Sequence, residues 1–205
     1  MFVDLHTHLD QYEPGELPGM FERARNAGVG AIIAAGVTVE STRRGLELAG
    51  EYDNVFAGVG VHPSDLTGEL DNDALDQLRF MAGNEQVVVM SEVGLDHQDH
   101  SPDRAMQERA FRAQIGIAHE AGLPVVFHMR FATADMLRVL TEERVSVLGG
   151  AAHYFQGSHD EAAAVIELGC YISLAKPLLR LPELGKVARE VPLEWIVLET
   201  DCYPQ

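Results

Sequence analysis

The sequence is poor in cysteine, in basic residues and in long apolar runs. Cys170 and Cys202 are its only two cysteines, and their wide separation argues against a disulfide framework and against a zinc-thiolate site. Lysine and arginine number 15 against 32 aspartates and glutamates, which gives a net charge of −17. A surface this acidic repels phosphate backbones, so we do not expect the broad basic face of a duplex-binding protein. It still admits a phosphate substrate, because bound divalent ions reverse the sign of the local field.

No stretch of the chain approaches the roughly 18 uninterrupted apolar residues of a membrane helix. No basic region precedes an apolar run at its start either. We therefore expect a cytoplasmic protein without a membrane partner. Apolar residues make up 46% of the chain and charged residues 23%, so the composition favours one globular domain, 1–205, with a buried core. Nothing in the sequence specifies the oligomeric state.

Short apolar segments rich in β-branched residues alternate with segments whose apolar residues lie three or four positions apart. Continuous apolar strands are typical of parallel sheets covered on both faces, and the intervening helical spacing indicates β-α units. About eight such units favour a TIM (β/α)8 barrel of the α/β class over an open doubly wound sheet. The expected strands are residues 2–6, 31–34, 55–59, 87–91, 125–128, 145–148, 170–173 and 195–199.

The expected barrel lacks its final C-terminal helix. A complete barrel usually takes about 250 residues. Here the eighth expected strand ends at Glu199, six residues before the end of the sequence. We therefore expect either a truncated barrel or another cover for the last strand, without which apolar strand and helix surface is exposed.

Histidines and carboxylates gather at the carboxyl ends of the expected strands. In a (β/α)8 barrel these ends converge on one mouth, so residues far apart in sequence share one pocket. Residues i and i+2 of a strand point the same way, so His6 and His8 can bind one ion. Imidazole nitrogen with carboxylate oxygen suits Zn or Mn, and oxygen-rich positions also admit Mg. The candidates are Asp4, His6, His8, His62, Glu92, His128, His153, Glu199 and Asp201.

The residue types suggest different roles within this set. A carboxylate at a strand end, such as Glu92, can bridge two ions about 4 Å apart, as binuclear hydrolysis requires. Asp201 suits a ligand that also accepts a proton from the attacking water. Arg130 can bind a phosphate or carboxylate through its planar guanidinium group, or can be an exposed arginine on the next helix. His62 can contact the substrate or can structure a loop.

Other polar residues leave two interpretations open. Asp96 can orient a ligand histidine or cap a turn. Glu199 can support Asp201 or pack inside the barrel with a polar partner. Four more histidines are expected on the surface: His97, His100, His119 and His159.

Six short motifs occur in order along residues 1–203. They are Asp4-x-His6-x-His8-Leu9-Asp10, Gly60-Val61-His62-Pro63, Glu92-Val93-Gly94-Leu95-Asp96, Leu123-Pro124 leading to His128-x-Arg130, His153-x-Phe155-x-Gly157 and Glu199-Thr200-Asp201. In this order they resemble the TatD family of metal-dependent deoxyribonucleases, within the amidohydrolase-like barrels. The resemblance implies a TIM barrel with one or two divalent ions, Mg, Mn or Zn, and phosphodiester hydrolysis that is typically exonucleolytic on DNA.

The resemblance also implies a ligand set and a substrate. Carried onto matching positions, the metal ligands are His6, His8, Glu92, His128, His153 and Asp201. The expected protein is a DNase of the 3′ exonuclease type that cleaves single-stranded or frayed ends through a metal-activated water, with Asp201 and Glu92 catalytic. Arg130 and His62 are then the expected substrate-binding residues.

The chain departs from the family pattern at the expected substrate rim. Residues 97–100 follow Gly-Leu-Asp where the family often has an aromatic residue, Phe131 stands where an acidic residue is common, and Tyr154 replaces a usual cysteine. Two other functions therefore stay open. One is a metal-dependent hydrolase of a small amide, lactone or phosphate ester, because related barrels host such chemistry. The other is a non-catalytic assembly protein that keeps a metal for structure.

Overall fold

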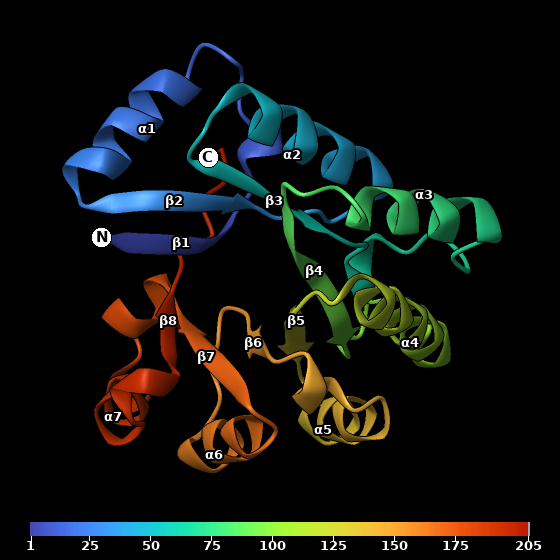
Figure 1. Cartoon of the computed structure of the whole chain (residues 1–205). Coiled ribbons are helices and arrows are strands. Elements are labelled where there is room, and N and C mark those ends of the chain that lie inside the picture. Colours follow the sequence, from blue (N-terminus) through green and yellow to red (C-terminus); the bar gives the residue numbers. More distant parts are fainter. Residues whose placement is uncertain (205) are drawn as a thin grey trace.

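The computed structural model describes residues 1–204 and contains one parallel sheet of eight strands, each paired with the next along the chain. The strands are β1 (Phe2–Thr7), β2 (Val29–Ala34), β3 (Val55–Val59), β4 (Val87–Asp96), β5 (Val125–Arg130), β6 (Gly150–Ala152), β7 (Cys170–Leu174) and β8 (Ile196–Leu198). The sheet curls until β8 lies beside β1 (Figure 1), and Thr7 forms a parallel bridge with Cys202. The expected TIM barrel is therefore confirmed, nearly closed in the described residues.

An α-helix follows each of the first seven strands and packs on the outside of the barrel (Figure 1). The helices are α1 (Leu17–Asn26), α2 (Val39–Glu51), α3 (Asn72–Ala82), α4 (Arg104–Ala121), α5 (Thr133–Glu142), α6 (His159–Glu167) and α7 (Pro182–Glu190). Short 3-10 turns are η1 (Leu9–Gln11), η2 (Pro63–Asp65), η3 (Val145–Val147), η4 (Lys176–Leu179) and η5 (Leu193–Trp195). Over residues 1–204 no helix is long and apolar enough to span a bilayer.

Side-chain caps fix where four of these helices begin. Thr38, Asp71, Asp103 and Ser158 each accept a hydrogen bond from the backbone N–H three residues further on. Such caps satisfy donors that the first helical turn leaves free. Each cap therefore fixes the residue at which the loop after a strand ends and its helix begins.

The strands are apolar because both of their faces are buried. Val125 and Phe127 of β5 pack into the large cluster between sheet and helices, whereas Val126 joins a smaller cluster made only of strand residues. That smaller cluster also contains Ile33, Val89 and Ala151, and it fills the barrel interior. The alternation follows the two-residue period of a strand and explains why the apolar runs are continuous.

The prediction of the sixth strand at residues 145–148 is wrong. Val145–Val147 forms the 3-10 turn η3 and Val145 packs into the helix-side core, while the strand itself is Gly150–Ala152. Gly150 has φ +157, and a Cβ there would lie 2.0 Å from the Val125 carbonyl oxygen. Close approach to β5 therefore selects glycine at a position where strand propensity favours valine.

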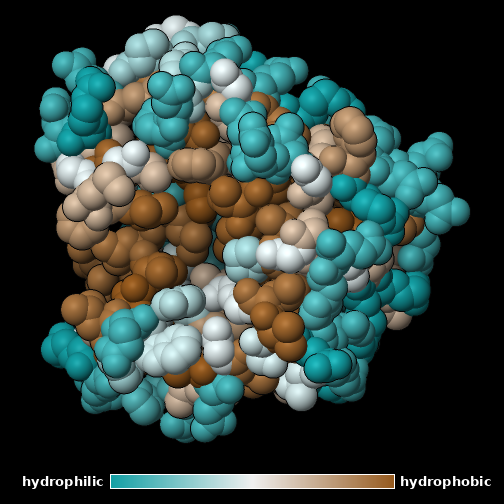
Figure 2. Space-filling view, in the orientation of Figure 1, coloured by the Kyte–Doolittle hydropathy of each residue, from teal (hydrophilic) through white to brown (hydrophobic). Residues whose placement is uncertain are grey.

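One side of the barrel exposes apolar side chains where β1 and β8 meet. Phe2 and Val3 of β1 and Leu198 of β8 are 57%, 47% and 45% exposed. Figure 2 shows this side as a hollow apolar area next to polar helix surfaces. The exposed strand surface expected for a barrel without an eighth helix is thus present, and within residues 1–204 no helix covers it.

Candidate metal centre

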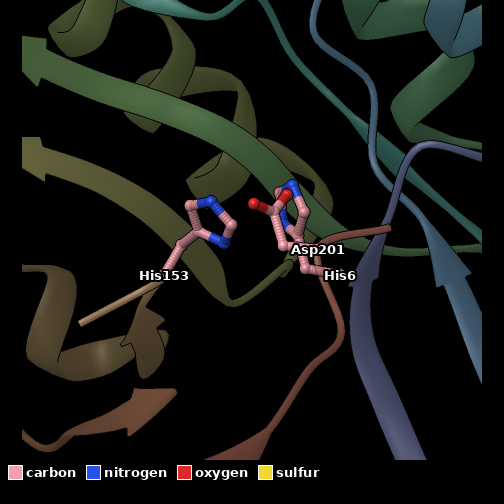
Figure 3. Close-up of side chains that lie close together, drawn as sticks. All are labelled: His6, His153 and Asp201. Carbon is pink, nitrogen blue, oxygen red and sulfur yellow. The ribbon is translucent and has the colours of Figure 1, made fainter. Parts of the chain in front are cut away.

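Six polar side chains converge at the mouth of the barrel from strands far apart in sequence. They are His6 in β1, His8 directly after it, Glu92 in β4, His128 in β5, His153 after β6 and Asp201 after β8. Figure 3 shows three of them, His6, His153 and Asp201, facing the same space from different segments. The structure therefore brings together all six residues that the sequence singled out as metal ligands.

Oxygen Oε2 of Glu92 faces the histidines of the first strand. It lies 3.2 Å from His6 Nε2 and 3.8 Å from His8 Nε2. His8 Nε2 also lies 3.2 Å from Asp201 Oδ1. The i, i+2 pair of histidines therefore shares one carboxylate oxygen, as the spacing predicts for a strand.

Oxygen Oε1 of the same carboxylate faces three other imidazoles. It lies 3.1 Å from His153 Nε2, 3.6 Å from His128 Nδ1 and 3.6 Å from His62 Nε2. The two oxygens of Glu92 thus belong to two different sets of nitrogen atoms. A carboxylate in this position can bridge two ions.

A local irregularity in β4 places Glu92 at this point. Ser91 pairs with Val126 and Val93 with Phe127, so Glu92 has no partner residue on β5 and forms a bulge. The register of β1 against β2 slips in the same way between Asp4 and Thr7, next to His6. Bulges redirect side chains. We infer that these two bulges direct Glu92 and His6 into the mouth, where a regular alternation of side chains would direct them elsewhere.

Gly94 allows β4 and β5 to approach closely beside the cluster. It has φ +145 and pairs with His128, and a Cβ there would lie 2.2 Å from the His128 carbonyl oxygen. The glycine of the Glu-x-Gly motif therefore serves backbone geometry.

Carboxylates behind two of the histidines fix which ring nitrogen faces the site. His128 Nε2 lies 3.0 Å from Asp96 Oδ2, and His153 Nδ1 lies 3.0 Å from Glu199 Oε1. His128 Nε2 donates its hydrogen to Asp96, whereas His153 Nδ1 makes an ion-pair contact with Glu199. In both rings the other nitrogen, His128 Nδ1 or His153 Nε2, is the one that faces the site. Asp96 also accepts hydrogen bonds from the following turn, so both of its expected roles are present.

His62 has the opposite arrangement. Its Nδ1 accepts a hydrogen bond from the Ser64 backbone N–H at 3.1 Å. In the neutral ring the hydrogen is then on Nε2, the atom that faces Glu92. Burial lowers the pKa of His62 to about 4, so the ring is neutral near pH 7. His62 therefore presents a hydrogen-bond donor to the site, although its Nε2 lies close enough to be counted among potential ligands.

The charges in the cluster suit a cation. Burial opposes ionisation of Glu92, yet His153 and His6 hold its pKa well below the usual range. Asp201 is partly buried, and a hydrogen bond with His8 lowers the pKa of its carboxyl group. In this structure the imidazoles supply the compensating positive charge, since Glu199 and Glu92 raise the pKa of the buried His153 ring well above its usual range. A bound divalent ion would take the place of those protons.

The donor set also fits a divalent ion geometrically. Three overlapping groups each hold their donor atoms within 4.8 Å of one another, and Glu92 belongs to two of them. Nδ1 of His6 and Nδ1 of His8 are buried without a hydrogen-bond partner among the described residues. Imidazole nitrogen and carboxylate oxygen are ligands of Zn, Mn and related ions, so the cluster can hold one or two divalent metals.

Asp4 is not part of these groups and instead holds the segment that carries Asp201. Its two oxygens accept hydrogen bonds from Thr200 N at 2.8 Å and Thr200 Oγ1 at 2.7 Å. Asp201 N in turn donates to the His6 carbonyl oxygen at 3.0 Å. Glu199 contacts His153, not Asp201, so the support expected for Asp201 comes from Asp4 and Thr200.

A cavity of about 700 Å³ opens from the cluster toward β5, β6 and β7. Arg130 is exposed at the end of β5 and lines this cavity, so it is not on the following helix. Arg180 and Tyr203 also line it, and sequence reasoning missed them because neither belongs to a motif. His100, His119 and His159 are exposed as expected, whereas the surface assignment of His97 is wrong, since its side chain is only 5% exposed and packs beside α5.

The chain is similar to known proteins over nearly its whole length. A family model described as TatD related DNase matches residues 3–204. The metal-dependent hydrolase YabD of Bacillus subtilis is 34% identical over 207 residues, which cover 98% of this chain and 80% of that protein. The 3′-5′ ssDNA/RNA exonuclease TatD of Edwardsiella piscicida is 34% identical over 192 residues, covering 92% and 74%. The crystal structure of YJJV, a TatD homologue from Escherichia coli, has a TM-score of 0.90 at 30% identity, covering 98% of this chain and 78% of that one.

Proposed function

Because the chain belongs to the family of TatD-related DNases and is a metal-dependent hydrolase, we propose that it hydrolyses phosphodiester bonds of DNA. The proposed mode is that of a 3′ exonuclease acting on single-stranded or frayed ends. The observation that carries the proposal is the buried, ionised Glu92 carboxylate, whose two oxygens face two sets of imidazole nitrogens at the floor of an open cavity. The name of the Edwardsiella relative supports the choice of nucleic acid as substrate.

The proposed ligands are the six residues of the cluster, and the proposed metals are Mg, Mn or Zn. Bound divalent ions supply Lewis-acid stabilisation of phosphate charge and lower the pKa of water. The protein contributes the orientation of the ligands: Asp96 and Glu199 hold the rings of His128 and His153 so that one nitrogen of each faces the site. The ligand residues are His6, His8, Glu92, His128, His153 and Asp201.

Asp201 is the proposed proton acceptor. Its carboxylate is ionised, lies at the rim between His8 and the cavity, and is 15% exposed at its side chain. It is thus within reach of a water molecule that enters with the substrate, whereas Glu92 is enclosed by imidazoles. A general base contributes typically about 10²- to 10⁴-fold in rate.

His62 and Arg130 are the proposed substrate contacts. The Nε2 hydrogen of His62 points into the site and can donate to a non-bridging phosphate oxygen. Arg130 offers a guanidinium group in the cavity wall, and that group forms no ion pair or hydrogen bond with any other described residue. Both donors complement the negative charge of a phosphodiester.

The decisive experiment measures metal-dependent hydrolysis of a single-stranded oligonucleotide labelled at its 5′ end. A 3′ exonuclease produces a ladder of progressively shorter labelled products after metal addition and none after chelation. Asp201→Asn serves as the matched variant, since it keeps the size of the side chain; we expect loss of hydrolysis with most of the bound metal retained, measured by elemental analysis.

One outcome would overturn the proposed nuclease activity, and another would overturn only the role of Asp201. Metal-loaded protein at concentrations equal to the DNA could leave the strand intact and hydrolyse a small lactone, amide or phosphate ester, which would favour the small-molecule hydrolase. Retained turnover by Asp201→Asn would refute the assignment of Asp201 as the proton acceptor while leaving the activity itself standing.

A further inference from the structure

Left-handed backbone is concentrated at the mouth of the barrel. Among the described residues, four that are not glycine have positive φ, and three of them line the cavity: Phe131 (φ 52), Tyr154 (φ 47) and Asp201 (φ 48). Bulky residues rarely adopt this conformation, because the Cβ atom clashes with the backbone. Strain of this kind persists only where neighbouring contacts fix the chain, and it is often found at functional sites.

The contacts that hold these residues are present. His97 N donates to the Arg130 carbonyl oxygen at 2.9 Å and so extends the pairing of β4 with β5 up to Phe131. Tyr154 N donates to Glu199 Oε1 at 2.6 Å. Both aromatic residues are therefore held in place by the same strands that hold the metal cluster.

The strained backbone presents aromatic rings to the cavity. Phe131 is 78% exposed although phenylalanine is usually buried, and Tyr203 is 48% exposed. Tyr154 lies next to the cluster, with its ring 5.7 Å from that of His153. All three residues line one cavity, and exposed aromatic faces in a groove are the surfaces on which the bases of a single strand stack.

Unpaired cations accompany these rings. Arg130 and Arg180 line the cavity, and neither guanidinium group forms an ion pair or hydrogen bond with another residue of the described chain. Lys176 Nζ lies 5.3 Å from the centre of the Tyr203 ring. In a chain with a net charge of −17, free guanidinium groups beside aromatic rings match a phosphate-linked chain of bases.

Nearby acidic groups are either occupied or on the other side of the mouth. Glu161 lines the cavity, but it accepts hydrogen bonds from Thr133 Oγ1 at 2.6 Å and Ser158 N at 2.7 Å. Past β3, a separate small cavity is lined by Asp65, Glu69 and Asp71. An anionic strand is therefore repelled from the β3 side and attracted to the side of β5, β6 and β7.

We propose that Phe131, Tyr154, Tyr203, Arg130 and Arg180 form a nucleoside-stacking subsite that holds the terminal nucleotides of a single strand. The bases stack on the aromatic rings, with Phe131 as the main platform, and the phosphates pair with the two arginines. This inference rests on the proposed nuclease function and adds to it a requirement for unpaired bases.

Binding to two fluorescent strands tests the subsite. One is an oligothymidylate, and the other is an abasic strand of the same length; both are titrated by anisotropy into metal-loaded Asp201→Asn protein. We expect this protein to bind the oligothymidylate more tightly than the abasic strand. Phe131→Gly should weaken binding of the oligothymidylate by about tenfold, the effect of one stacked base, and leave the abasic strand unaffected. Phe131→Tyr should retain the preference.

The choice of glycine separates binding from folding. Glycine suits φ 52 without strain, so Phe131→Gly is expected to unfold at the same temperature as the parent protein or higher. Phe80→Ala, which removes an 86% exposed ring from α3, is the matched control and should change neither affinity. Arg180→Gln should weaken the binding of both strands equally, whereas Arg189→Gln on α7 should weaken the binding of neither.

The results distinguish failure of this inference from failure of the nuclease proposal. Equal affinity of the Asp201→Asn protein for the two strands, or an unchanged preference in Phe131→Gly, would overturn the subsite even if DNA is hydrolysed. An absence of both DNA binding and DNA hydrolysis in the metal-loaded protein would overturn the nuclease proposal and the subsite with it.

Discussion

Replacement of Glu199 by glutamine tests whether the carboxylate behind His153 prepares that ring to bind metal. Glu199 Oε1 lies 3.0 Å from His153 Nδ1, an ion-pair contact, and accepts a hydrogen bond from Tyr154 N at 2.6 Å. Its Oε2 accepts one from Ser173 Oγ at 2.6 Å. Glutamine can keep all three contacts, since its carbonyl can face the first two donors and its amide can donate to the Ser173 oxygen. The substitution therefore removes the charge and little else.

Loss of the charge weakens the contact that orients His153. A hydrogen bond to a charged group contributes about 1.5–3 kcal/mol, and one between neutral groups about 0.5–1.5 kcal/mol. The difference of about 1–1.5 kcal/mol corresponds to roughly five- to tenfold in a binding constant. We therefore expect Glu199→Gln to bind a divalent ion about tenfold more weakly, at the lower end of the range for outer partners of metal-bound histidines.

Competition with a chromogenic chelator for zinc measures this change near neutral pH. Ser173→Ala is the matched control, because it removes a contact to the same carboxylate and preserves the charge; its zinc affinity should equal that of the wild type. Thermal unfolding of the metal-free proteins checks that the fold is intact. If Glu199→Gln binds zinc as tightly as the wild type, the charge of Glu199 does not prepare His153 and the reasoning is refuted.

Three further predictions concern other parts of the molecule. His62→Ala should lower kcat/KM on DNA by about a hundredfold without changing the number of bound ions. His62→Gln should recover part of the lost activity, because its amide replaces the hydrogen-bond donor. A loss of metal in either variant would make His62 a ligand instead. Gly94→Ala should lower the free energy of unfolding by about 2–3 kcal/mol, whereas Gly116→Ala, in open space on α4, should raise it by about 0.5–1 kcal/mol, both measured by urea denaturation. Hydrogen bonds from two arginines lower the pKa of Glu108 to about 2, so its stabilisation is present above pH 4.5 and is lost as the pH falls toward 2. Glu108→Gln should therefore cost about 0.5–1 kcal/mol at neutral pH and progressively less in acid, and a constant difference would contradict this assignment.

The positions of the ligand residues are predictable because a parallel barrel imposes them. Apolar β-branched segments identify most of the strands, and the first polar residue after such a segment lies at its carboxyl end. Since all these ends meet at one mouth, the proximity of His128 and His153 can be predicted without any knowledge of the loops. The sixth strand is not predictable in this way, because Gly150–Ala152 forms a strand as a result of close packing against β5 and not of strand propensity.

The functional difference between the histidines is not predictable from sequence. His62 follows the apolar strand β3 and His128 lies near the end of the apolar strand β5, yet His62 accepts a hydrogen bond from a backbone N–H and His128 donates one to Asp96. We propose that this difference makes His128 a ligand and His62 a hydrogen-bond donor. It depends on whether a nearby backbone N–H or a distant carboxylate contacts the ring. The bulge at Glu92 is equally unpredictable from the sequence, because it is defined only by the register of β4 against β5.

The distribution of charge at the mouth limits how much nucleic acid the protein can hold. Within residues 1–204, Arg130, Arg180 and Lys176 are the cations found around the aromatic rings, whereas the chain as a whole carries an excess of acid. For a single strand the slope of log affinity against log salt is about −0.7 per neutralised phosphate, so three contacts give about −2. A long basic groove with about ten contacts would give about −7. A measured slope near −2 for an oligothymidylate supports a footprint of a few nucleotides, whereas a slope steeper than about −4 would require cationic surface that this chain does not place at its mouth.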